Sequence, residues 1–404
     1  MKAELPDDDA ALATREDSFS LVTGDPLFRA QRRVGLIPAR GLGTGRRIAV
    51  AVALTWLPLM LWALWYRRLL PGVADEPLLR HFGIHARFLI ALPLFLASEG
   101  LVERALRRVL PQFVSSGVVD ESLLPAFKQI LTRAARRRDS RAALFVILAL
   151  VAAISLAGWE GSAHNHELLW AVPSGDNLAA ANFAAVWFAW VSRPLFLIAL
   201  FAWLWRLVVV TRLFQQIAGL DLRLAPTHPD RAGGIAFVEK LPAAFAPFFF
   251  GIAVVIAGRW GHDALYHGLP VDELRIPAAM LVAISTLVGL APLAVFAGRL
   301  RGAKRRSLVA VGALLADYGR LFDRRWIHGE TVADGGLLGA PEIGPVADTV
   351  ALYDAVRRMR VVPLSRQSLI PVALAAALPL VPVFATQMPL QQALFKLLGP
   401  LVGL

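Results

Sequence analysis

The sequence predicts an all-α integral membrane protein, a polytopic bundle of about six or seven transmembrane helices with a helical cytoplasmic portion. Three observations lead to this prediction. Hydrophobic residues make up 57% of the chain and the mean hydropathy is +0.57, which is too apolar for an ordinary soluble domain. Apolar stretches of about 18 residues recur, long enough to cross a hydrocarbon core of roughly 30 Å. Arginines gather in several of the connections between these stretches.

The composition also narrows the class of protein. The chain has no cysteine, which excludes disulfides and thiolate metal sites. Its formal net charge of +12 would indicate nucleic-acid binding in a soluble protein. In a membrane protein, basic loops beside an anionic leaflet explain that charge better. We therefore expect the lipid bilayer and anionic headgroups as partners, and no nucleic acid.

We divide the chain into six parts. These are a cytoplasmic or interfacial N-terminal segment (1–47), spans one and two (48–103), a cytoplasmic helical loop (104–141), spans three to six (142–300), a cytoplasmic helical region (301–366) and a last apolar stretch with an interfacial tail (367–404). The first part is acidic and then basic, without an early apolar core, so we expect no signal peptide in it.

Each expected span is an apolar stretch bounded by charged or aromatic residues. The expected spans cover 48–66, 88–102, 142–159, 183–210, 241–256 and 277–297, followed by 369–385. The last stretch contains three prolines, so we expect either a seventh span or a broken half-helix buried in protein. Helical spacing of apolar residues from Leu308 to Phe322 predicts a cytoplasmic helix, and further helices are expected at 121–138 and 346–359.

The charges of the connections predict the orientation. The loop 160–182 has acidic residues and no lysine or arginine, so we place it outside. The loop 104–141 and the segment 299–306 are rich in arginine, which places them, the elbow 214–240 and the N-terminus in the cytoplasm. The loop 67–87 disagrees, because it would lie outside and yet holds several arginines.

Arg193 is the most unusual residue of the predicted spans. It lies about 10 residues from the outer end of span four, roughly 15 Å deep at helical rise, and Glu99 lies at a similar depth in span two. Charges are unfavourable in lipid, so each should face protein or water. Three interpretations stay open: a buried Arg193–Glu99 ion pair, the charged lining of an ion or anionic-solute path, and an arginine that snorkels to the interface.

A second group of candidate residues consists of histidines on the predicted outer side. They are His81, His85, His164, His166, His262 and His267. Imidazoles with nearby carboxylates suit Zn, Cu or Ni, so a transition-metal site is one interpretation, although no HExxH motif occurs. The alternatives are hydrogen bonding to loops and headgroups, and titration as a pH sensor. Beyond a transition metal, the sequence identifies no cofactor.

The elbow contains the sequence HPDRAGG at 228–234. His228, Arg231, Gly233 and Gly234 form a candidate anion site, because glycines allow close backbone approach and a helix N-terminus follows. The alternative is a tight turn in which Asp230 caps that helix and pairs with Arg231.

The elbow sequence, together with 341–348 and 356–360, resembles segments of a group of uncharacterised bacterial polytopic membrane proteins. The resemblance covers the loop after span four and the last quarter of the chain. It implies a location in the bacterial inner membrane. It carries no activity and no functional residue.

For the function, the sequence favours an oligomeric channel or facilitator for small ions or solutes, because a buried arginine and glutamate are expected at midplane. The first alternative is a signalling or scaffold membrane protein that senses a ligand or metal outside and recruits a cytoplasmic protein partner. The second is a membrane-embedded metalloenzyme. No catalytic triad, paired catalytic carboxylate or nucleotide motif occurs, so enzymatic activity is the less favoured expectation.

Overall fold

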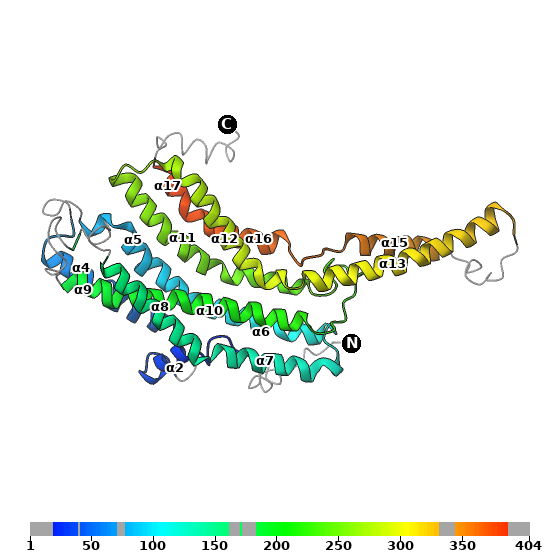
Figure 1. Ribbon diagram of the computed structural model, residues 1–404, viewed down its shortest axis with the longest axis horizontal. Helices are drawn as coiled ribbons and strands as arrows, with labels where there is room; N and C mark the ends of the chain where they lie inside the picture. The colour runs from blue at the N-terminus through cyan, green and yellow to red at the C-terminus, as the bar shows by residue number, and fades with distance from the viewer. Residues whose placement is uncertain are drawn as a thin grey trace, which may run out of the picture.

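The computed structural model describes residues 19–38, 41–70, 77–160, 170–171, 183–330 and 344–386. The regular secondary structure of these residues is entirely helical (Figure 1). Six of the described helices are long and apolar enough to cross a membrane. They cover Thr44–Trp65, Glu121–Ala157, Phe183–Ala218, Ala236–Tyr266, Val271–Ala294 and Arg366–Ala385. The predicted fold class, a polytopic helical membrane bundle, is confirmed.

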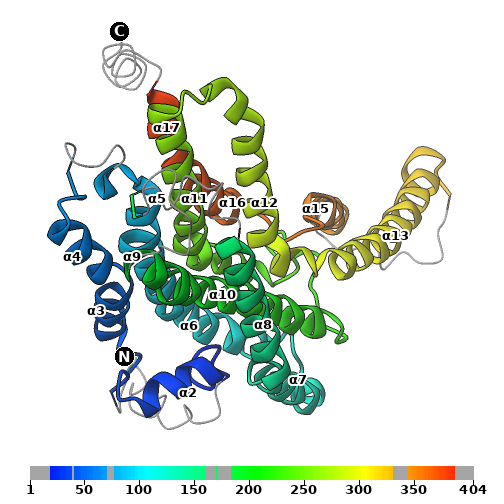
Figure 2. The ribbon, with the colours of Figure 1, turned by 60° about the vertical axis from the view of Figure 1, so that its left-hand side comes forward.

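The chain enters the bundle through a buried N-terminal segment. Leu21 and Val22 are fully buried, and Asp25 begins the short helix α2 (Pro26–Arg33) by accepting a hydrogen bond from the Leu27 N–H at 2.8 Å. Such a cap satisfies one of the free N–H groups at a helix start. Helix α2 lies across one side of the bundle (Figure 2). The first span follows as α3 (Thr44–Thr55) and α4 (Leu57–Trp65).

The second predicted span lies inside a longer helical rod. This rod consists of α5 (Phe82–His85), a π-helical stretch (Ala86–Ala91) and α6 (Leu92–Ser115), and it follows a short 3-10 turn (Leu78–Arg80). It is not among the six candidate spans, and it packs between α3 and α11 (Leu241–Tyr266). The rod continues well past the predicted end at residue 102, so its charged second half extends beyond the expected span.

The third and fourth spans form a second layer beside this rod. Helix α7 (Leu124–Arg138), after a 3-10 turn (Glu121–Leu123), packs along the fourth span and leads into α8 (Arg141–Glu160). The fourth span consists of α9 (Phe183–Trp187), a π-helical stretch (Phe188–Ser192) and α10 (Arg193–Ala218). The predicted helix at 121–138 is therefore present.

Helix α11 lies between this part and the C-terminal part of the bundle. It follows a 3-10 turn (Ala236–Lys240) and packs against α6 and against α16 (Arg366–Ala377). After a further 3-10 turn (Val271–Leu274), α12 (Arg275–Ala294) packs against α16 as well. Gly289 permits this packing, because a Cβ there would lie 2.9 Å from Phe249 of α11 and from Val372 of α16.

The last apolar stretch is helical and closes the bundle. After α16, a 3-10 turn (Leu378–Leu380) connects to α17 (Val381–Ala385), and all three segments pack against α11. Prolines at 379 and 382 lack an N–H donor, which accounts for the short change of helix type there. Of the two expectations for 369–385, the structure favours the continuous helix. The expected tail at 390–404 lies outside the described residues.

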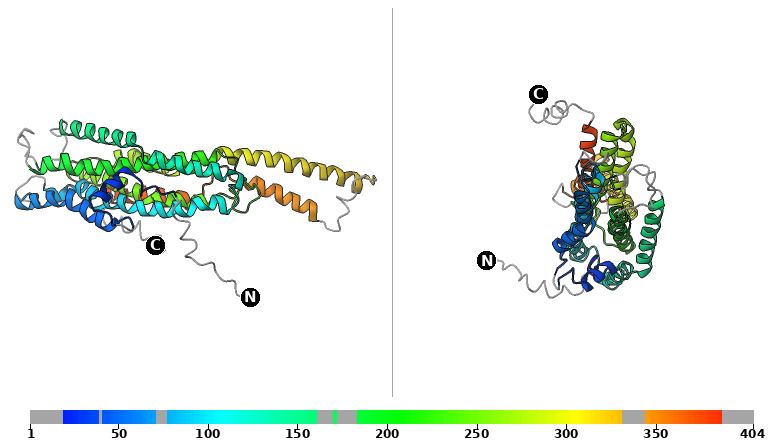
Figure 3. Two further views of the ribbon diagram at one scale, coloured as in Figure 1. Left: turned by 90° about the horizontal axis from the view of Figure 1, so that it is seen from below. Right: turned by 90° about the vertical axis from the view of Figure 1, so that its left-hand side faces the viewer.

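A long helical hairpin projects from one end of the bundle. Helix α13 (Ala297–Phe322) follows α12 after a two-residue bend and ends in a π-helical stretch (Asp323–Ile327). Helix α15 (Gly344–Arg358) packs back along α13. Figures 1 and 3 show that this α13–α15 hairpin extends far beyond the other helices. The helices predicted at 308–322 and 346–359 are both present.

Candidate functional site

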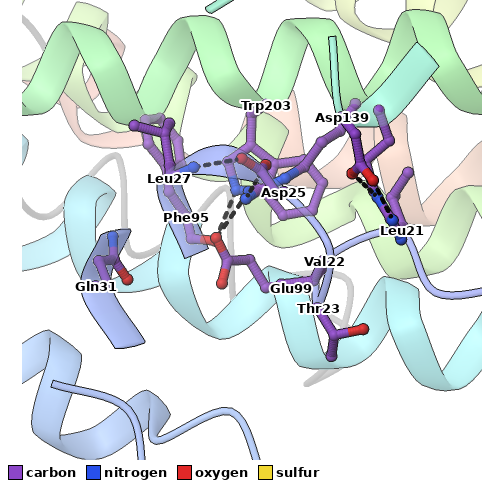
Figure 4. A network of polar contacts seen from close by, with 12 residues as sticks. Leu21, Val22, Thr23, Asp25, Leu27, Gln31, Phe95, Glu99, Asp139 and Trp203 are labelled. Carbon is purple, nitrogen blue, oxygen red and sulfur yellow. Dashed lines mark hydrogen bonds and ion pairs between the residues drawn. The ribbon is translucent and has the colours of Figure 1, made fainter. Parts of the chain in front are cut away.

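Four charged side chains meet in the bundle interior, and we call them the ionic cluster. Asp25 precedes α2, Arg47 lies in α3, Glu99 in α6 and Arg206 in α10. Arg206 donates from Nη1 to Glu99 Oε1 at 2.7 Å and from Nη2 to Asp25 Oδ2 at 2.9 Å. Arg47 donates to Glu99 Oε2, and its Nε donates to Gln31 Oε1 at 2.6 Å. Figure 4 shows Asp25 and Glu99 directed toward this common centre.

The ionic cluster is buried and balanced in charge. Each of its four side chains is at most 9% exposed, and two carboxylates face two guanidiniums. A buried charge is tolerated only with such partners, because removal from water disfavours ions strongly. The guanidinium of Arg206 also lies over the ring of Trp203, 5.4 Å from its centroid. The arrangement therefore joins α2, α3, α6 and α10 at one point.

The predicted Arg193–Glu99 pair is not formed. Both oxygens of Glu99 accept from other arginines, and Arg206 lies 13 residues beyond Arg193 on α10, about 20 Å at helical rise. The guanidinium of Arg193 lies 5.2 Å from the ring centroid of Phe188 instead. Depths counted from the outer ends did not match, because the rod that holds Glu99 begins at Phe82, before the predicted start at 88, whereas the fourth span begins at Phe183 as predicted. A passage role for Arg193 and Glu99 stays a prediction.

Sequence reasoning missed three members of the cluster. Arg206 lies inside the expected span 183–210, and Asp25 and Arg47 lie in the N-terminal segment 1–47, but none of the three is among the predicted site residues. Asp25 carries one usable signal, because an aspartate before a proline is typical of a helix start. Its pairing with Arg206 joins positions 181 residues apart in the chain, and no local pattern predicts such a contact.

The N-terminal segment is held at a second point, toward α7. The Leu21 N–H donates to Glu103 Oε2 at 3.0 Å, and Arg138 donates to the carbonyl oxygen of Ser20. Arg138 also pairs with Asp139, Nε to Oδ1 at 2.7 Å. Figure 4 shows Asp139 beside Leu21. Residues 20–25 are thus built into the bundle.

The elbow is organised by the carboxylate of Asp230. Its Oδ1 accepts from the N–H groups of Ala232 at 2.8 Å and Gly234 at 3.1 Å, and its Oδ2 accepts from Ala236 at 3.0 Å. The amides at Gly234 and at the following turn therefore already hold a carboxylate from the same chain. This arrangement favours the capped turn over the predicted anion site of His228, Arg231, Gly233 and Gly234.

The environment of Asp230 changes its protonation equilibrium. Partial burial alone would raise the pKa of this carboxyl, but three backbone N–H donors and His228 outweigh burial and lower the pKa below its usual value. The nearest contact with His228, Nδ1 to Oδ1, is 3.0 Å. Asp230 is therefore ionised at neutral pH and holds the turn as an anion.

The elbow also contacts the segment 356–360. The Arg360 N–H donates to the Arg231 carbonyl oxygen at 2.8 Å, and its Nη2 donates to the Asp230 carbonyl oxygen at 3.0 Å. The same guanidinium pairs with Glu239 at 2.8 Å. The base of the α13–α15 hairpin is thus fixed to the elbow.

Three of the six predicted histidines meet at the C-terminal end of α11. His81 stacks on His262 with ring centroids 4.7 Å apart, and the Nε2 atoms of His262 and His267 are 3.3 Å apart. A cavity of about 300 Å³ adjoins them between α5 and α11. We call this cavity the histidine pocket. Its polar lining consists of His81, Arg87, Arg259, His262 and Asp263.

His85 does not join this group. His85 accepts a hydrogen bond from Trp56 Nε1 at 3.0 Å, and its Nε2 lies 3.1 Å from the Leu78 carbonyl oxygen. One ring nitrogen therefore contacts the first span, and the other contacts the 3-10 turn before α5. His164 and His166 lie outside the described residues.

No family model, no curated protein and no solved structure matches this chain.

Proposed function

We propose that this integral membrane protein is a signalling protein that binds a ligand at the histidine pocket and moves the α13–α15 hairpin in response. One observation supports this function most directly. Helices α12 and α16 both pack against α11, and the C-terminal half of α11 lines the pocket. Helix α12 leads into α13, and α15 leads into α16, so each of the two connects to one arm of the hairpin. Helix α5, which lines the pocket, and the α13–α15 hairpin lie at opposite ends of the bundle (Figure 1).

The packing supports transmission along α11. At Gly289 the backbone of α12 approaches Phe249 of α11 and Val372 of α16 so closely that no Cβ would fit without movement. Packed helices respond to a displacement at one end by sliding or rotating as units rather than by local compression. A shift of α11 against α5 at the pocket would therefore displace α12 and α16, and with them both arms of the hairpin.

The charge distribution supports a cytoplasmic hairpin and an outer pocket. The base of α13 carries Lys304, Arg305 and Arg306, and Arg324 and Arg325 follow near its tip. Such basic segments stay on the cytoplasmic side of a membrane. With this orientation, a bacterial inner-membrane protein would receive its ligand outside and present the hairpin to a cytoplasmic partner.

The test uses the absence of cysteine, which makes spin labelling specific. Cysteines would replace Ala316 on α13 and Lys128 on α7, both exposed, in protein reconstituted in nanodiscs. We expect the Arg259→Ala change in the pocket to shift the distance distribution between the two labels. The Arg212→Ala change, at an exposed position of α10, should leave this distribution unaltered. An identical distribution in the pocket variant would contradict the proposal.

A second candidate function is passage of small ions or solutes. It is favoured by a cavity of about 210 Å³ that lies between α3, α6 and α10 and reaches Arg47, Glu99 and Arg206. In liposomes, Ile198→Trp, which fills this cavity, should abolish any flux. Val208→Trp, on an exposed face of the same helix, should not. Absence of flux at every voltage and pH would end this candidate.

A further inference from the structure

We propose that His262, Asp263 and His267 bind a divalent transition metal of the zinc type. The inference deepens the proposed function, because it names the class of ligand at the histidine pocket. All three residues lie within the last turn of α11 and its C-cap. One ligand atom from each lies within 4.8 Å of the others.

The protonation of His262 can be assigned from its neighbours. Its Nδ1 lies 2.9 Å from the carbonyl oxygen of Arg80. A carbonyl only accepts hydrogen bonds, so Nδ1 carries the hydrogen and the Nε2 of the neutral ring carries a lone pair. Metal-bound histidines commonly use this arrangement, in which a backbone carbonyl holds one nitrogen and the other nitrogen binds the metal.

The lone pair of His262 is directed at a second imidazole. The distance of 3.3 Å between Nε2 of His262 and Nε2 of His267 matches the separation of two ligands on a tetrahedral zinc, roughly 3.3–3.4 Å for zinc–nitrogen bonds of about 2.0–2.1 Å. Without metal, the His267 Nε2–H donates to His262. With metal, His267 carries its hydrogen on Nδ1, and both Nε2 atoms face the ion.

The third ligand and the surroundings complete the site. The Asp263 Oδ2 accepts from Arg259 Nε at 2.9 Å, which orients the carboxylate and leaves Oδ1 for the metal. The ring of His81 stacks on His262 with an interplanar angle of 28° and fixes its plane. Nitrogen donors favour Zn, Cu or Ni over Ca or Mg.

Three protein ligands leave one position of a tetrahedral metal open. His262 and Asp263 both line the histidine pocket, so this position faces a cavity that also contains Arg87 and Arg259. Water or a small anion would fill it, in the manner of zinc sites that keep an exchangeable ligand.

The test is a titration of chelator-treated full-length protein in nanodiscs with Co²⁺ and then Zn²⁺. We expect one Co²⁺ per chain, with the visible absorption bands of tetrahedral cobalt, displaced by Zn²⁺. His267→Ala and His262→Ala should weaken binding by more than about 100-fold, since loss of outer-shell partners alone reaches 10–100-fold. His81→Phe keeps the ring stacking and should retain binding, as should His228→Ala at the exposed elbow.

Binding that persists in His262→Ala and His267→Ala, or the absence of tetrahedral bands, would overturn the metal site. His267 is exposed at a helix end, so its replacement should not impair folding. The labelled hairpin separates the two proposals. Stoichiometric metal with an unmoved hairpin supports the site and contradicts signalling. If the protein binds no metal but the hairpin moves in the pocket variants, signalling is supported and the metal site is contradicted.

Discussion

Glu99 of α6 accepts from Arg206 of α10 across 2.7 Å in the bundle interior, and its second oxygen accepts from Arg47 of α3. One carboxylate thus joins three helices, and Asp25 extends the contact to α2 through Arg206. The network is most easily understood as a structural centre, because every oxygen of Glu99 already has a cationic partner.

Replacing Glu99 should therefore destabilise the whole bundle. Glu99→Gln leaves two buried guanidiniums without their shared carboxylate, and breaking a buried ion pair from one side costs about 3–5 kcal/mol. Unfolding followed by tryptophan fluorescence in mixed micelles measures the change. Glu121→Gln, at an exposed position before α7, is the matched control and should have little effect. Equal stability of the two variants would contradict the structural role.

Asp230 should make the stability of the elbow depend on pH. Its folded pKa is lowered, whereas the unfolded value is about 3.9, so ionised Asp230 stabilises the fold above that value. This stabilisation is lost as the pH falls below about 3.9 through the folded pKa. The free energy of unfolding of Asp230→Asn should lie below that of the parent at pH 7, by about 1–3 kcal/mol, and the difference should shrink toward pH 3. A difference that is constant over this range would be inconsistent with the capping carboxylate.

Gly289 offers a direct test of helix packing. A valine there would meet Phe249 and Val372, whose atoms lie 2.9 Å from the position of a Cβ, and overpacking of this kind typically costs about 1–3 kcal/mol. Gly319→Ala on α13 is the control, because no atom lies within 4 Å of its Cβ position. It should leave stability unchanged or raise it by up to about 1 kcal/mol, as alanine favours a helix. Thermal unfolding measures the stability of both variants. A Gly289→Val protein as stable as the Gly319→Ala protein would contradict the close packing of α12 against α11 and α16.

Arg360 should hold the hairpin base to the elbow. Arg360→Ala removes donors to Glu239 and to the Asp230 carbonyl oxygen but keeps the fold of the spans. We expect faster hydrogen exchange at 228–240 and 356–364, and unchanged exchange in α6. Arg357→Ala, an exposed arginine on α15, is the control. Equal exchange rates at 228–240 and 356–364 in the two variants would show that the contact of Arg360 does not stabilise the junction.

The sequence predicted the helices far better than the contacts. Apolar length and helical spacing are local properties, so most spans and the α13–α15 hairpin could be predicted. Glu99 was recognised as a buried charge, but its partners were not. Arg47 and Arg206 lie at distant chain positions, and only packing of α3, α6 and α10 brings them together.

The histidines show the same limit. His262 and His267 are five residues apart at the end of one helix, so their proximity follows from local structure. His81 joins them only because α5 packs against α11. His85, one turn along from His81, points to Trp56 instead. Spacing along the chain could not separate these two outcomes.

We propose that the histidine pocket and the α13–α15 hairpin lie on opposite sides of the membrane. Single cysteines at Glu273, beside the pocket end of α12, and at Ala316, on the hairpin, can be labelled in intact cells with an impermeant maleimide. We predict labelling of Glu273→Cys in intact cells and of Ala316→Cys only after permeabilisation. Labelling of both positions from outside, or of the hairpin alone, would contradict the account.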